Sequence, residues 1–286
     1  MTHSRALAMA HISVFLMGVA AVFAEVSGFE AWRTTSYRVT FGAAVLLVFM
    51  LMRRRLRLPA PKRSLLFLGL GFLLSIHWFA FFRSIELLGV ILGSAMLGFE
   101  PVIIAVAARL MLGEKVPKRT LWAMGISLIG FVMLGSGQQE HSSELIRGVS
   151  WSIFAFLTFA ILVVANRKFV SSESPLTLTF LEMLGAIPLA VIMTGADWAP
   201  ADSASWVYAL ILGLLCTGAA YVLYNTSMQV LSAPVAGLLL SLEVVYGMGG
   251  GYLIGDSISG RQALAALFIA NILFWDIWQF LRKRGQ

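Results

Sequence analysis

Two glutamates in this sequence lie in the middle of long apolar segments. Glu100 falls in "MLGFEPVIIAV", residues 96–106, and Glu243 falls in "LLLSLEVVYGM", residues 238–248. An ionised carboxylate at the centre of a membrane span costs roughly 2.5–3.5 kcal/mol on insertion scales. Glu100 is therefore expected to have a polar partner, to face a wet cavity or to be protonated. Facing a cavity, such a group could pair with a cation or carry a proton.

Pro101 follows Glu100 directly. Because proline lacks an N–H group, the carbonyl of Leu97 should lose its intrahelical partner, and the helix should kink there. A free carbonyl at membrane depth is tolerated where it lies against protein or lines a water-filled cavity. The pair predicts a hinge beside a substrate cavity, or a buried acid with a kink that only shapes packing. Val244 follows Glu243, so a kink is expected in the first segment only.

His77 is a further candidate because histidine is rare within membrane spans and titrates near neutral pH. The alternative is a neutral histidine bonded to a neighbouring carbonyl or hydroxyl. Large apolar side chains are predicted to line the same cavity, although an aromatic belt at the membrane surface would explain several of them. These residues are Trp78, Phe81, Met96, Phe99, Trp151, Phe154, Tyr221, Tyr224 and Tyr246.

Two more charged residues fall within apolar segments. Arg38 could bind a substrate carboxylate, pair with an acid or extend to the membrane surface. The last two alternatives taken together are favoured over the first. Glu182 is also expected to face the helix bundle rather than lipid. Gly247 and Gly251 are four residues apart, and this GxxxG pattern predicts close packing between helices. Pro101 is the predicted hinge.

The composition indicates the class of protein that holds these residues. Of 286 residues, 59% are hydrophobic and only 12% are charged, about half the charged fraction of a soluble domain. A spanning helix needs about 20 mostly apolar residues. The expected fold is an all-α membrane protein with ten transmembrane helices. Their predicted ranges are 6–24, 35–52, 64–82, 90–112, 120–137, 149–166, 175–194, 206–224, 233–254 and 262–281.

The positions of the basic residues predict an orientation. Most of the 21 Lys and Arg residues fall in connections on the same side as the N-terminus. Cytoplasmic loops carry such an excess, so both termini are expected in the cytoplasm. The net charge of +7 therefore does not indicate nucleic-acid binding.

The two halves of the chain resemble each other. Glu100 and Glu243 match at an offset of 143, as do Trp78 with Tyr221 and Phe81 with Tyr224. We expect two five-helix repeats, residues 1–145 and 146–286. Because five is odd, the second repeat must be inverted relative to the first. Inverted repeats are typical of secondary transporters, whose substrate site lies near the bilayer midplane.

Three segments resemble the EamA branch of the drug/metabolite transporter (DMT) superfamily. They are "GVILGSAMLGFEPVIIAVAARLMLGEKVPKRTLWAMGISLIGFVML", "GVSWSIFAFLTFAILVVANRK" and "SYRVTFGAAVLL". Within that family the chain looks like a bacterial amino-acid exporter of the aromatic-amino-acid efflux type. The sequence departs from the family pattern at Val244, where proline is usual, and at Asp256, where glutamate is usual. The resemblance implies a ten-helix fold in the bacterial inner membrane.

The sequence therefore predicts a secondary transporter that exports aromatic and other neutral amino acids and related small metabolites by alternating access. Export and the amino-acid class rest on the resemblance. The alternative is a broad-specificity exporter of drugs or lipophilic cations, served by aromatics and an acid. No catalytic, metal-ligand or nucleotide-binding motif is recognised, so we expect neither an enzyme nor a cofactor. The expected partners are a small-molecule substrate and the lipid bilayer, with no nucleic acid, and a monomer is expected to suffice.

Overall fold

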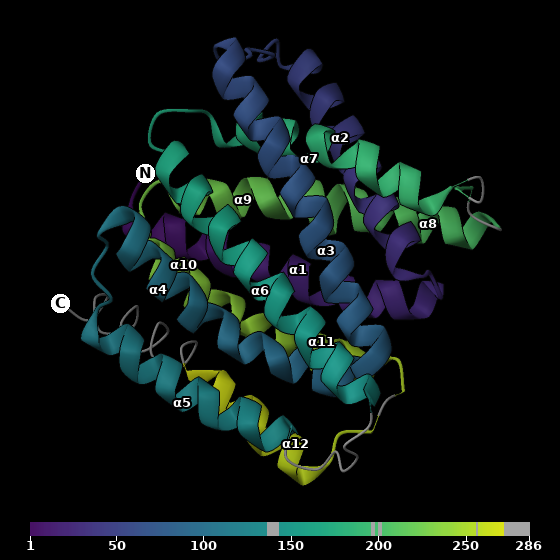
Figure 1. The fold of residues 1–286 in the computed structure, drawn as a ribbon, viewed down its shortest axis with the longest axis vertical. Helices are drawn as coiled ribbons and strands as arrows, with labels where there is room; N and C mark the ends of the chain where they lie inside the picture. Colours follow the sequence, from purple (N-terminus) through teal and green to yellow (C-terminus); the bar gives the residue numbers. More distant parts are fainter. Residues whose placement is uncertain (136–142, 196–197, 200–201, 256, 272–286) are drawn as a thin grey trace.

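A computed structural model shows how the chain folds. It describes residues 1–135, 143–195, 198–199, 202–255 and 257–271, without the side chains of 89–95 and 135. Its regular elements are α1 (His3–Ser27), α2 (Ala31–Met52), α3 (Pro61–Met96), η1 (Leu97–Phe99), α4 (Glu100–Leu112), α5 (Lys118–Gly135), α6 (Ser143–Phe169), α7 (Pro175–Thr194), α8 (Ser203–Gly213), η2 (Leu214–Ala219), α9 (Ala220–Ser227), α10 (Ala233–Leu240), α11 (Leu242–Leu253) and α12 (Gly260–Ile269). All of these described elements are helical, as predicted (Figure 1).

Seven described segments are long and apolar enough to cross a membrane. They are His3–Ser27, Ala31–Met52, Pro61–Leu88, Ser143–Phe169, Pro175–Thr194, Ser203–Ser227 and Ala233–Leu253. Each overlaps one predicted span. The predicted span 90–112 overlaps α4, which has only 13 residues, and the span 120–137 overlaps α5, which has 18. The predicted span 262–281 lies partly outside the described residues.

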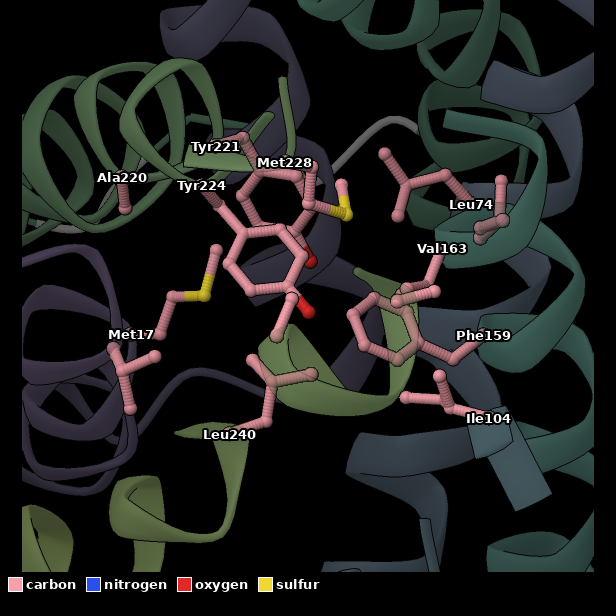
Figure 2. Packing of buried hydrophobic residues seen from close by; sticks show 14 of the residues in the cluster. Met17, Leu74, Ile104, Phe159, Val163, Ala220, Tyr221, Tyr224, Met228 and Leu240 are labelled. Atoms are coloured by element: carbon pink, nitrogen blue, oxygen red, sulfur yellow. The ribbon is translucent and has the colours of Figure 1, made fainter. Parts of the chain in front are cut away.

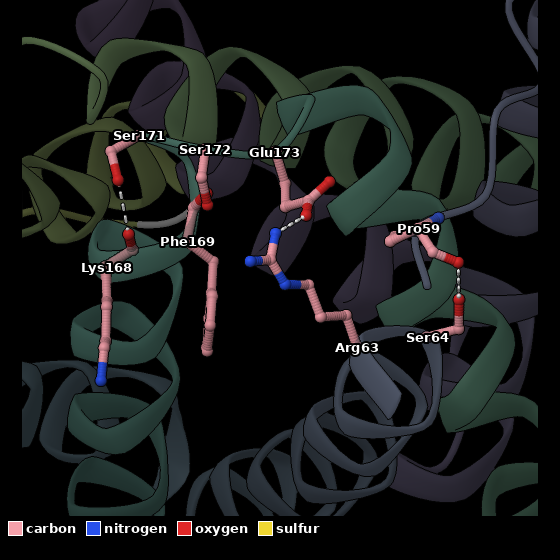
Figure 3. A network of polar contacts seen from close by, with 8 residues as sticks. All are labelled: Pro59, Arg63, Ser64, Lys168, Phe169, Ser171, Ser172 and Glu173. Carbon is pink, nitrogen blue, oxygen red and sulfur yellow. Dashed lines mark hydrogen bonds and ion pairs between the residues drawn. The ribbon is translucent and has the colours of Figure 1, made fainter. Parts of the chain in front are cut away.

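The chain reverses direction between the start of α3 and the end of α4. Arg63, at the start of α3, pairs with Glu173, just beyond the end of α6 (Figure 3). Glu114, just beyond α4, pairs with Arg167 near the same end of α6. A straight helix of 36 residues would span about 54 Å, well beyond a bilayer core of about 30 Å. The predicted reversal between the two spans is therefore present, but the helix does not end at residue 82 as predicted, because it continues through residues 83–89 to Met96.

Both glutamate-bearing segments are interrupted at the same relative position. A 3₁₀ turn precedes Glu100, whose N–H donates to the carbonyl of Leu97. In the second half, Ser241 separates α10 from α11, and its N–H donates to Leu238 at 3.1 Å. The prediction of a kink in the first segment only is therefore wrong. A switch to i→i+3 bonds breaks the helix without proline and also satisfies the Leu97 carbonyl that was expected to be free.

Replacing Pro101 with alanine is thus expected to leave the interruption in place. Pro101 lies in the first turn of α4, where proline is well tolerated and only restricts the unfolded chain. We expect a loss of no more than about 1 kcal/mol of stability. Thermal unfolding in detergent and substrate uptake would measure the effect, and loss of uptake in a stable variant would contradict it.

The helices of the two halves interleave. In the first half, α1 packs against α9 and α11, and α2 packs against α7 and α8. The long helix α3 packs against α6 and α7, and α5 pairs with α12 along one edge of the bundle (Figure 1). Side chains of α1, α4, α6, α9 and α10 meet in the main core, which includes Met17, Ile104, Phe159 and Leu240 (Figure 2). The walls of any central cavity must therefore come from both halves.

Candidate functional site

A cavity of about 520 Å³ lies between the two halves. Its deepest polar residues are Arg38, His77 and Glu100, each no more than 5% exposed. It extends to Glu25 near the end of α1 and to Ser257 before α12, both of which are exposed. The cavity therefore connects the interior with the end of the bundle at which α1 ends.

Eight of the fifteen predicted substrate-contact and hinge residues line this cavity. They are His77, Trp78, Phe81, Glu100, Tyr221, Glu243, Gly247 and Gly251. These residues fall in four different predicted apolar segments, and the fold brings them to one space. The two glutamates enter it from the start of α4 and the start of α11, where the interruptions of the two helices lie.

Arg38 on α2 is the basic group of the cavity. Its Nε donates to Thr217 Oγ1 at 2.9 Å, and its Nη2 donates to the carbonyl of Cys216 at 3.4 Å. Both acceptors belong to η2, a π-helical segment that interrupts the predicted span 206–224. Such segments change the backbone hydrogen-bond pattern and occur often at functional sites. In the described part of the chain, no carboxylate lies within ion-pair distance of this guanidinium.

An aromatic wall holds Arg38 in place. Its guanidinium carbon lies 4.2 Å from the ring centroid of Trp78 and 5.6 Å from that of Phe82. Trp78 Nε1 donates to Tyr221 Oη at 3.0 Å, and the two rings meet edge to face at 5.3 Å. Trp78 and Tyr221 are one of the pairs matched between the two halves of the sequence, and the fold brings their side chains into direct contact.

His77 lies in the same wall with one nitrogen already bound. Its Nδ1 lies 2.9 Å from the carbonyl oxygen of Ala155, which can only accept, so Nδ1 carries the hydrogen. The ring stacks on Phe159 with centroids 4.5 Å apart. Both interpretations from the sequence therefore describe part of the observed geometry: His77 bonds a neighbouring carbonyl, and it also lines the cavity.

Seven of the predicted residues do not line the cavity. Phe99 and Phe154 are 42% and 43% exposed, on faces turned away from the bundle. The others occupy helix faces that meet a neighbouring helix or the edge of the bundle. Trp151 packs against Phe79, Tyr246 packs against Phe15, and Met96 packs in the cluster that contains Phe156. Tyr224 lies in the main core, and Pro101 lies in the first turn of α4.

The cavity wall also contains residues outside the predicted set, and it includes Arg38, for which another role is predicted. Arg38 was expected to pair with an acid or reach the membrane surface, whereas it lines the cavity. Phe82, Phe159 and Gly18 also line the cavity, and they are not among the predicted contact residues. Gly18 lets α1 approach α11, since a Cβ at this position would lie 2.8 Å from the carbonyl oxygen of Glu243. A lone glycine within an apolar span carries no signal of that contact.

Comparison with known proteins places this fold in a family. A model of the EamA-like transporter family matches residues 4–136 and, a second time, residues 146–274. An uncharacterized transporter of Archaeoglobus fulgidus is 27% identical over 268 residues, covering 92% of this chain and 93% of that protein. The uncharacterized transporter YyaM of Bacillus subtilis is 22% identical over 256 residues, covering 84% and 82%.

A solved crystal structure shares the fold. It superimposes with a TM-score of 0.77 at 19% identity, covering 94% of this chain and 95% of that one. At this identity the likeness concerns the arrangement of helices alone. Together with the family match, it indicates that the cavity lies within a two-repeat helical framework.

Proposed function

This chain belongs to the EamA-like transporter family, and we propose that it exports aromatic and other neutral amino acids and related small metabolites by alternating access. Family membership makes it a multi-pass membrane transporter. The substrate class is our proposal, as are the bacterial inner membrane, cytoplasmic termini and function as a monomer. The observation that carries the substrate class is the combination of the Arg38 guanidinium with the Glu100 and Glu243 carboxyl groups in the interior of an aromatic cavity.

The chemistry of the cavity suits a zwitterion. Arg38 offers a planar donor group for an α-carboxylate, and its contacts with Thr217 and the Cys216 carbonyl hold it without neutralising it. Glu100 and Glu243 offer acceptors for an α-ammonium group. Trp78, Phe81 and other rings give an apolar wall for side chains of varied shape. A phosphorylated substrate would instead require several cationic groups at the midplane.

Alternating access is supported by the way the bundle is closed at one end. The cavity reaches exposed residues near the end of α1. At the opposite end, Glu114 joins three helices, because it pairs with Arg167 of α6 at 2.9 Å and accepts the N–H of Ala233 of α10 at 2.9 Å. We propose that residues 1–145 and 146–286 are inverted repeats that rock about this site, with the Pro101, Gly247 and Gly251 positions at the moving contacts.

The second candidate function is export of lipophilic cations, which two carboxyl groups among aromatic rings would favour. Replacing Glu100 with glutamine separates the two. Cation export is expected to fall at least about tenfold, because a buried charge pair contributes more than ~1.4 kcal/mol. Amino-acid export should stay within about threefold, since Glu243 can still face the ammonium group. Paired uptake assays with a radiolabelled amino acid and a lipophilic cation would measure both.

The function itself is tested by reconstitution. Purified protein in proteoliposomes is expected to take up several radiolabelled neutral amino acids, aromatic ones among them, faster than protein-free vesicles do. Uptake of a lipophilic cation while no amino acid moves would overturn the proposal. The predicted contact residues His77, Trp78, Phe81, Tyr221 and Glu243 can then be replaced one at a time in the same assay.

A further inference from the structure

A second buried acid lies outside the substrate cavity. Glu182 on α7 is 1% exposed, and it is not among the residues that line the cavity. Its Oε2 accepts a hydrogen bond from Asn166 Nδ2 of α6 at 3.3 Å, and its Oε1 is buried with no hydrogen-bond partner among the described residues. A carboxylate in such a place is held by a single neutral amide, which is a weak substitute for water.

Glu182 belongs to a polar network that joins three helices. The Nδ2 of Asn166 also donates to Asn225 Oδ1 of α9 at 3.3 Å. Asn225 in turn donates to Thr179 Oγ1 of α7 at 2.9 Å. Asn166 Oδ1 is buried and, like Glu182 Oε1, has no described partner. Two residues that are bonded to each other thus each keep a buried oxygen acceptor without a described donor, and a proton on Glu182 would supply one donor.

No cation in the described part of the chain neutralises Glu182. The titratable groups within helices packed against α7, or on the helix that carries Asn166, form their recorded contacts elsewhere. On α2 and α3 these contacts include Tyr37 with the Trp198 carbonyl, Arg38 with Thr217, Arg63 with Glu173, His77 with the Ala155 carbonyl, and Arg83 with Glu86. On α6 and α9 they include Arg167 with Glu114, Lys168 with the Phe169 ring, and Tyr221 with Trp78, while the buried Tyr224 hydroxyl has no described partner. An unpaired charge at this depth is costly, so the neutral carboxylic acid is the form that fits this conformation.

We propose that Glu182 is a proton-binding site that couples transport to the proton gradient, an inference that rests on the proposed export function. The carboxylate takes up one proton on Oε1 in the conformation described above, in which the cavity reaches the end where α1 ends. It releases that proton when the opposite end opens and water reaches the network. A proton therefore moves one way across the membrane while substrate moves the other, so the carrier is an antiporter.

The network is placed to link this proton to the substrate. Asn166 lies two turns along α6 from Phe159, and Asn225 lies one turn along α9 from Tyr221. Phe159 and Tyr221 both line the substrate cavity. A shift of α6 that reshapes the cavity wall also moves the Asn166 amide that bonds Glu182. A shift of α9 moves Asn225, which accepts a hydrogen bond from that same amide. Protonation and substrate binding therefore act on the same two helices, which is the requirement for coupling between two sites.

Two measurements test this site with the variant Glu182→Gln, which keeps the shape and removes the titration. In proteoliposomes, the wild-type protein should accumulate a radiolabelled neutral amino acid when a pH gradient is imposed. The variant should lose that accumulation by about tenfold or more, while exchange of labelled for unlabelled amino acid at equal pH persists. Glu144→Gln, an exposed acid at the start of α6, is the matched control and should retain both activities.

The second measurement needs no substrate. Because ionising a buried, unpaired acid destabilises the fold, the Tm of the wild-type protein in detergent should fall as pH rises from mildly acidic to alkaline. Over the same pH range, the Tm of Glu182→Gln should fall by a few degrees less than that of the wild type. The Tm of Glu144→Gln should fall by as much as that of the wild type. An unchanged pH dependence in Glu182→Gln, or gradient-driven accumulation at the wild-type level, would overturn the inference. If the wild-type protein exchanges labelled for unlabelled amino acid but does not accumulate it in response to a pH gradient, the proton-coupling inference is overturned and the proposed export function stands.

Discussion

Replacing Arg38 with glutamine is expected to lower amino-acid transport at subsaturating substrate by at least about 30-fold. Removing one partner of a buried charge pair costs roughly 2–5 kcal/mol, and each 1.4 kcal/mol is a factor of ten. Arg38 is the basic group of the cavity, and its guanidinium is held by Thr217 and the Cys216 carbonyl without a described ion pair. The α-carboxylate of a bound amino acid would therefore lose its charged partner.

An amine that lacks the carboxylate distinguishes binding from folding. Tryptamine presents the ring and ammonium group of tryptophan, so its ability to compete should survive in Arg38→Gln while that of tryptophan is lost. Arg38→Lys keeps the charge but loses the flat donor face that stacks on Trp78, and it should fall between the wild type and the glutamine variant. Full tryptophan transport in a stable Arg38→Gln protein would show that this guanidinium does not bind substrate.

Replacing Gly71 with alanine is expected to destabilise the protein severely. A Cβ on Gly71 of α3 would collide with the backbone of Glu182 on α7, and a Cβ on Gly185 of α7 would collide with the backbone of Leu68 on α3. Backbone cannot move aside as a flexible side chain can, so α3 and α7 would have to separate. Overpacking of this kind costs about 1–3 kcal/mol or more, a large part of the stability of a typical domain.

Gly69 provides the control within the same helix. Its added Cβ would meet nothing within 4 Å, so Gly69→Ala should keep or slightly raise the Tm, because alanine is the better helix former. Thermal unfolding followed by size-exclusion chromatography in detergent would compare the two variants. Equal melting temperatures for Gly71→Ala and Gly69→Ala would contradict the close crossing of α3 and α7.

The membrane character and the buried glutamates could be predicted because each depends on local sequence. An apolar run of span length is visible in any window, and Glu100 is conspicuous within one. The second helix interruption could not be predicted, because Val244 carries no signal and the break at Ser241 arises from a change in backbone bonding. Proline indicates where a helix is forced to break, whereas other residues break where packing requires it.

The position of Arg38 was unpredictable for a different reason. Its acceptors are Thr217 and the backbone carbonyl of Cys216, about 180 residues away along the chain, and that carbonyl lies within a π-helical segment. Sequence analysis can show that a buried arginine needs partners, but not that an altered backbone provides them. The match of Trp78 with Tyr221 predicts an equivalence between the halves, but their hydrogen bond is a property of the folded bundle and has no signal in the sequence.

The interleaving of the two halves has a consequence for how the protein is made. The helices α1, α2 and α3 find most of their partners among α6, α7, α8, α9 and α11, which are synthesised later. When the ribosome has completed α5, the earlier helices lie in the lipid with their principal contact faces uncovered. They must remain there, shielded by lipid or by insertion chaperones, until the second half arrives. Assembly is therefore a late event in biosynthesis, and a chain truncated after α5 should be degraded rather than stored.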